Sequence, residues 1–117
     1  MLARMASRRQ ALEDRIRRIK KEIAALDELR PGSLSKQYNV CGRSGCRCKA
    51  DPPQKHGPYY QLSFSFRGKN TSEFVRREEL PRVREQIRNY KRLRTLLDQW
   101  TAATMALAKL RRDESRR

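Results

Sequence analysis

The sequence predicts an α+β fold that is mainly helical, in which two long helices, paired as an antiparallel hairpin or a coiled coil, bracket a β-hairpin. Apolar residues recur at helical spacing in the first and last thirds of the chain, and they alternate with polar residues in the middle. The chain has 117 residues, of which only 7% are aromatic. We therefore expect a single domain over residues 1–117 with little enclosed core.

The first helix is predicted over residues 5–30. Apolar residues repeat every seven positions at Met5, Leu12, Ile19 and Leu26, which places one apolar stripe along the helix. Ser7 and Gln10 match a capping box, a common start signal. The helix should end at Arg30-Pro31, because a proline disfavours helical geometry in the residue before it.

The second helix is predicted over residues 81–112, where Pro81 is acceptable in the first turn. Its apolar positions follow one another at spacings of three or four: Val83, Ile87, Tyr90, Leu93, Leu96, Trp100, Ala103, Leu107 and Leu110. The two apolar stripes can pair within one chain or between the chains of a homodimer.

A β-hairpin is predicted over residues 59–75. Apolar side chains alternate with polar ones at Tyr60, Leu62, Phe64 and Phe66, which predicts a strand with one apolar face. A glycine turn at 67–70 leads to a return strand. We expect Phe64, Phe66 and Trp100 in the core. Because an isolated two-stranded hairpin is marginally stable in water, another group must stabilise it.

Residues 31–58 are predicted to form a metal-binding loop that holds every cysteine of the chain and its only histidine. The candidate ligands are Cys41, Cys46, Cys48 and His56. Three thiolates and an imidazole suit tetrahedral Zn²⁺, and a structural zinc ion would brace the hairpin. The alternatives are three reduced cysteines beside a loop histidine, an iron–sulfur cluster, or one disulfide with a spare thiol.

We do not expect an enzyme. A cysteine nucleophile would need His56 as its base, and the same imidazole is the fourth metal ligand. Between Arg30 and Glu73 the only acidic residue is Asp51. A zinc ion with four protein ligands has no open position for a reacting water.

The charge of the chain points to a polyanionic partner. It has 29 Lys and Arg against 13 Asp and Glu, a net charge of +16, and the excess is spread along the whole chain. Such a surface attracts DNA or RNA by releasing the counterions of the phosphates. The candidate contacts are Arg43, Arg47, Lys49, Lys55, Arg67 and Lys69, expected to form one compact cationic tip, and the helical residues Arg15, Arg18, Arg84, Arg88, Lys91 and Arg92.

Tyr59 is a further candidate, because an aromatic ring beside cationic residues can stack on an unpaired base. The alternative is that Tyr59 packs against the long helix. No segment resembles the recognition helix of a helix-turn-helix or a zinc finger, so binding is expected to follow nucleic-acid shape rather than sequence.

A membrane role is not expected. No stretch reaches the roughly 20 apolar residues that span a bilayer, and the N-terminus lacks a signal-like pattern. The odd number of cysteines argues against a secreted disulfide framework. These features predict a cytoplasmic protein.

The middle of the chain contains a series of short motifs in a fixed order. They are Cys41-Gly42, Cys46, Cys48, His56-Gly57-Pro58-Tyr59, Gly68-Lys69 and Phe74-Val75. This pattern resembles a small uncharacterised prokaryotic family with a C-G-x3-C-x-C run, an H-G-P-Y motif, an aromatic β-hairpin and flanking helices. The resemblance covers residues 31 to about 100. Proteins of this kind often lie near mobile elements, which implies work on DNA or RNA by association only.

Together these features predict a small basic zinc-containing nucleic-acid-binding accessory protein, acting as a subunit or cofactor of a mobile-element or RNA–protein machine. A larger protein partner or a homodimer is expected. The alternative is a helical protein–protein interaction module that recruits a recombinase or nuclease, or an antitoxin-like regulatory subunit.

Overall fold

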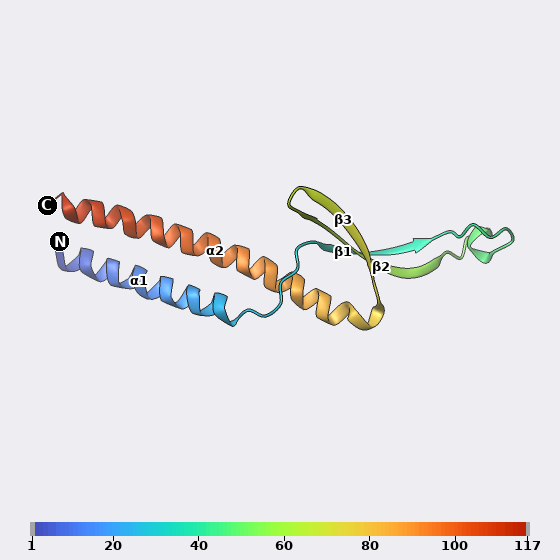
Figure 1. The fold of residues 1–117 in the computed structure, drawn as a ribbon, viewed down its shortest axis with the longest axis horizontal. Helices are drawn as coiled ribbons and strands as arrows, with labels where there is room; N and C mark the ends of the chain where they lie inside the picture. The colour runs from blue at the N-terminus through green and yellow to red at the C-terminus, as the bar shows by residue number, and fades with distance from the viewer. Residues whose placement is uncertain (1, 117) are drawn as a thin grey trace. The chain divides into compact units, whose positions relative to one another are not determined.

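The computed structural model describes residues 2–116 and has an α+β fold with two helices and a three-stranded antiparallel sheet (Figure 1). The elements are α1 (Leu2–Ala25), β1 (Ser33–Asn39), the short 3-10 turn η1 (Arg47–Lys49), β2 (His56–Phe66), β3 (Lys69–Val75), the 3-10 turn η2 (Arg77–Glu79) and α2 (Leu80–Ser115). Where the sequence predicts one domain, the chain divides into two compact units. The helix unit comprises residues up to Glu28 and from Asn89 onward, and the sheet unit comprises Leu29–Arg88.

In the helix unit, ion pairs join α1 to the later part of α2. Arg9 Nη1 lies 2.8 Å from Glu114 Oε2, and Arg92 Nη2 lies 3.0 Å from Glu22 Oε2. The first pair links the N-terminal part of α1 to the C-terminal end of α2, and the second links the C-terminal part of α1 to an earlier part of α2. The buried residues of this unit include four of the stripe positions predicted for the second helix: Leu96, Ala103, Leu107 and Leu110. Within residues 2–116, no helix is both long and apolar enough to cross a membrane.

Helix α1 begins before the predicted capping box and ends five residues earlier than predicted, at Ala25. The segment 26–30 has no regular secondary structure, and its last residue bonds to another element. The backbone N–H of Arg30 donates to the carbonyl of Gln86 at 3.1 Å. The helix therefore stops well before Pro31 imposes its own restriction.

The sheet has the order β1-β2-β3, with both neighbours antiparallel. The expected two-stranded hairpin is thus a three-stranded sheet, and β1 lies inside the segment 31–58 that was predicted to be one metal-binding loop. Strand β1 reads SLSKQYN, with only two apolar residues, so its composition gave no strand pattern. Strand β1 is stabilised by its backbone hydrogen bonds to β2, and a local sequence pattern does not reveal such pairing.

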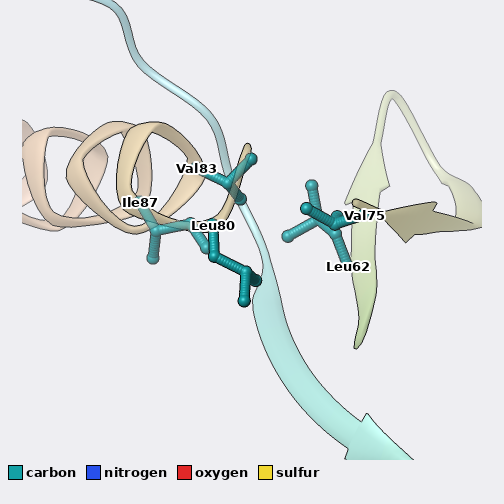
Figure 2. Packing of buried hydrophobic residues seen from close by; sticks show 5 residues of the cluster. All are labelled: Leu62, Val75, Leu80, Val83 and Ile87. Atoms are coloured by element: carbon teal, nitrogen blue, oxygen red, sulfur yellow. The ribbon is translucent and has the colours of Figure 1, made fainter. Parts of the chain in front are cut away.

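The core of the sheet unit forms where one face of the sheet meets the first turns of α2 (Figure 2). Leu62 of β2 is at its centre with an exposed fraction of 0%, and it is packed with Val75 of β3 and with Leu80, Val83 and Ile87 of α2. Tyr60 and Phe64 are partly buried against this cluster, as the alternating pattern predicts.

The prediction that Phe66 belongs to the core is wrong, because its side chain is 61% exposed. Phe66 ends β2 directly before the two-residue turn at Arg67 and Gly68. The Arg67 guanidinium lies over its ring, 5.2 Å from the ring centroid. The alternation of apolar and polar residues in β2 therefore continues past the part of the strand that packs against α2.

Candidate metal centre

The metal ligands predicted from the sequence lie in and directly after the connection between β1 and β2, at the end of β2 opposite to the β2–β3 turn. Asn39, the last residue of β1, is paired with His56, the first residue of β2. Cys41 follows two residues after Asn39. Antiparallel pairing therefore brings the two outer ligands, Cys41 and His56, to the same end of the sheet.

The two inner ligands are positioned by η1. The backbone is extended at Cys46 and then enters a single 3-10 turn that carries Cys48. The turn is closed by the N–H of Lys49, which donates to the Cys46 carbonyl at 3.0 Å. The N–H of Gln54 donates to the Arg47 carbonyl at 2.9 Å, which returns the chain toward β2. A tight turn between the two cysteines explains how the uncommon Cys-x-Cys spacing directs both sulfurs to one site.

The four ligand atoms all lie within 4.8 Å of one another. Cys41 Sγ is 3.6 Å from Cys48 Sγ, and Cys46 Sγ is 3.1 Å from His56 Nε2. Tetrahedral zinc, with Zn–S and Zn–N bonds of about 2.3 and 2.0 Å, implies ligand separations of about 3.8 Å for S–S and 3.5 Å for S–N. The cluster is thus close to the size that a tetrahedral ion requires, and it can hold a metal ion.

The cysteines are free thiols in the structure, so they form no disulfide. A hydrogen bond to the backbone of Cys48, helped by the side chains of Cys41, Cys48 and His56, lowers the pKa of Cys46 to about 6. Burial raises the pKa of Cys48, whose exposed fraction is 1%. The backbone N–H of Cys41 donates to Cys48 Sγ at 3.4 Å, a contact that favours thiolate character. A buried thiolate at this position is favoured further by a bound cation.

Gly57 explains part of the H-G-P-Y motif. Its φ is +138°, and a Cβ at this position would lie 2.7 Å from the Gln37 carbonyl oxygen and 2.9 Å from Tyr38 Cδ1. Only glycine lets β1 approach β2 so closely beside His56. The motif therefore places the imidazole and the close strand contact in consecutive residues.

All the cationic residues proposed as phosphate contacts are exposed. Arg43, Arg47, Lys49 and Lys55 lie in the same connection as the cysteines. Arg67 and Lys69 lie at the opposite end of β2, an 11-residue strand that spans roughly 33 Å. The prediction of one compact tip formed by all six residues is therefore wrong, because a strand separates the turn from the metal loop.

The remaining cationic candidates belong to different parts of the chain. Arg84 and Arg88 lie in the sheet unit, whereas Arg15, Arg18, Lys91 and Arg92 lie in the helix unit. Arg92 is already ion-paired with Glu22. Of the helical candidates, Arg84 and Arg88 therefore share a unit with the metal loop, and the other four belong to the helix unit.

Tyr59 is 43% exposed and lies on the sheet face opposite to Leu62. Three residues near it were not predicted from the sequence: Phe74, Arg76 and Arg77. The signal was available in the two-residue turn, which fixes the register and pairs Gln61 with Phe74. Phe74 consequently falls on the same face as Tyr59.

Residues 9–85 match a family model described as Domain of unknown function (DUF6788). The match includes most of α1, the whole sheet with its Cys/His cluster, and the first residues of α2. This finding agrees with the prediction of an uncharacterised family, and the match starts earlier and ends earlier than the predicted 31 to about 100. Comparison with curated proteins and with solved structures finds no match. The chain belongs to the DUF6788 family, whose model covers the part of the chain that contains the candidate metal centre.

Proposed function

We propose that the protein is a small zinc-containing nucleic-acid-binding accessory protein. The observation that carries this proposal is the convergence of four soft ligands within 4.8 Å in a connection that also exposes Arg43, Arg47, Lys49 and Lys55. A metal ion there would hold a cationic loop in one shape. The loop could then contact phosphates without first being ordered by them.

Zinc is the ion that the ligand set suits best. Iron–sulfur clusters are usually held by four thiolates, whereas this cluster offers three thiolates and His56. All four positions of a tetrahedral ion would be filled by protein ligands, which is typical of a structural site and leaves no place for a reacting water. The proposed role is therefore binding and not catalysis.

The charge of the sheet unit supports a nucleic-acid partner. Residues 29–88 contain 13 Lys and Arg against 5 Asp and Glu, a formal net charge of +8. Phosphate contacts of this kind orient a protein on DNA or RNA without reading the sequence. We propose that the protein works in this way beside a larger mobile-element or RNA–protein machine.

The helix unit favours a protein contact. We propose that α1 and α2 pair as an antiparallel hairpin, supported by the ion pairs of Arg9 and Arg92. Leu97 and Met105 of α2 are exposed, at 44% and 68%. Apolar side chains on an otherwise charged helix are suited to a partner protein or a second copy of the chain.

Elemental analysis of the purified protein tests the metal directly, and one zinc per chain is expected. Cys46→Ser should lose the zinc, whereas Ser44→Ala, which changes an exposed residue of the same loop, should retain it. Removing zinc should disorder residues 40–55 and leave the emission of Trp100 unchanged, because this single tryptophan belongs to the helix unit. Protein that contains iron, or that contains no metal, would contradict the proposal.

Binding is tested by titrating single- and double-stranded DNA and RNA at several salt concentrations. We expect an affinity that falls steeply with salt, as counterion release requires, and that weakens when zinc is removed. Absence of binding to every nucleic acid near physiological salt would overturn the proposed function and leave the helical interaction module as the better description.

A further inference from the structure

We infer that the open face of the three-stranded sheet binds single-stranded nucleic acid, with two bases stacked on Tyr59 and Phe74 and the neighbouring phosphates contacted by Arg76 and Arg77. This inference deepens the proposed function and rests on it. It assigns the strand type and the contact residues, which the metal loop alone does not.

The face opposite to α2 has a floor of small polar side chains. Gln37 Nε2 donates to Gln61 Oε1 at 2.6 Å, and the hydroxyls of Ser63 and Ser72 are 3.2 Å apart. These side chains hydrogen-bond to one another across the strands. This face of the sheet is therefore mostly polar, and exposed aromatic side chains project from it.

Two aromatic rings project from this floor. Phe74 is 70% exposed and is paired with Gln61, so it is a diagonal cross-strand neighbour of Tyr59. Both rings line a depression of about 350 Å³ that also includes Val40, Cys41 and His56. The half-exposed Val40 extends the patch toward the metal ligands. Adjacent exposed aromatic rings of this kind indicate a binding surface rather than scattered surface residues.

The same two rings line a second depression, of about 510 Å³, together with Arg76 and Arg77. Among residues 2–116, the ion pairs of the structure do not involve these two arginines. Their guanidinium groups are thus able to contact phosphates directly beside the rings. Aromatic rings next to free arginines are the arrangement that single-strand binders use.

The carboxylates within the sheet do not oppose this occupant, and the nearest others, Glu78 and Glu79, follow Arg77 in η2. Between Ser33 and Val75 the only carboxylates are Asp51 and Glu73. Glu73 is paired with Leu62, which places it on the face toward α2, and its carboxylate is bound by Arg30 at 2.8 Å. The open face therefore favours an anionic ligand whose aromatic bases are exposed and free to stack. A duplex hides its base faces within the helix stack, so the unpaired strand is the better fit.

The test uses fluorescence anisotropy of the full chain with labelled strands of three kinds: single-stranded DNA and RNA, a duplex of equal length, and an abasic strand that retains the phosphates. We expect single strands to bind more tightly than the duplex or the abasic strand. Tyr59→Ala and Phe74→Ala should each weaken binding to intact single strands by roughly 10-fold, with little effect on the abasic strand. Comparing DNA with RNA shows which of the two is preferred.

Three variants serve as controls. Tyr59→Phe keeps the ring and should bind as the native protein does. Phe66→Ala removes an exposed ring from the other face and should not change binding. Replacing Arg76 and Arg77 by glutamine should weaken binding to intact and abasic strands alike, and should reduce the salt slope by about 0.7 for each lost phosphate contact.

The outcomes separate the two proposals. If native protein binds no nucleic acid, the proposed function and this inference both fail. If it binds, but the abasic strand is bound as tightly as the intact one, or Tyr59→Ala and Phe74→Ala bind as the native protein does, the stacking surface is refuted and the proposed function stands. Circular dichroism and thermal unfolding establish that each variant is folded.

Discussion

Substituting alanine for single glycines of the metal loop should separate two physical effects at the candidate metal centre. At Gly42, a new Cβ meets nothing within 4 Å and the backbone needs no positive φ. At Gly45 the space is also open, but φ is +78°, which costs an alanine roughly 1–2 kcal/mol. At Gly57 the backbone is strained, and the Cβ would also lie 2.7 Å from the Gln37 carbonyl oxygen.

These values predict a ranked loss of zinc affinity. The metal-bound state requires the backbone geometry that brings the four ligands together, so strain in that geometry raises its free energy. Gly42→Ala should bind zinc within about twofold of the native protein, and Gly45→Ala should bind roughly 5- to 30-fold more weakly. Gly57→Ala should lose about 100-fold or more, because the strain of order 1–3 kcal/mol is joined by a displacement of β1.

The assay is competition with a metal chelator of known affinity, followed by thermal unfolding of each zinc-loaded variant. Gly42→Ala is the matched control, since it adds the same methyl group to the same loop. Native affinity in Gly57→Ala would refute the reasoning, because the close approach of β1 to β2 would then not position His56. A loss in Gly42→Ala equal to that in Gly57→Ala would also refute it.

Two further predictions concern the stability of the two units. Leu62→Ala should lower the free energy of unfolding by about 2–5 kcal/mol, as expected at the centre of a core. Phe66→Ala changes an exposed position and should lower it by well under 1 kcal/mol. Equal shifts of the denaturant midpoint in the two variants would contradict the assigned core. A double-mutant cycle on Glu22 and Arg92 should give a coupling below about 1 kcal/mol that disappears at high salt, because both side chains are about half exposed. A larger coupling that resists salt would show that the pair is shielded from solvent.

The helices and β2 could be predicted from the sequence because their apolar residues repeat at the period of the element. Leu62 and Leu96 illustrate this: both belong to predicted stripes, and both are fully buried. Strand β1 could not be predicted in this way. It is mostly polar, and its place in the sheet depends on pairing with β2, which is information that a local pattern does not contain.

The composition of the candidate metal centre and its place before the hairpin could be predicted, whereas the strand that precedes it could not. Cysteine and histidine are few in this chain, so their clustering at 41–56 was visible without coordinates. Their place at the β1–β2 end follows from the unpredicted strand. The prediction of one cationic tip fails for a different reason, because the predicted hairpin itself has Arg67 and Lys69 at its turn and the ligand loop before its first strand.

The connection between β1 and β2 explains why the metal and the proposed stacking surface are expected to act together. Of residues 40–55, only Cys48 is buried, so apolar packing contributes little to their order. A metal ion would cross-link the start, the middle and the end of this connection through Cys41, Cys48 and His56. Cys41 and His56 also line the depression that contains Tyr59. Order imposed at the ion would therefore extend directly to one wall of the stacking surface, so the metal would shape the place where the bases bind without contacting them.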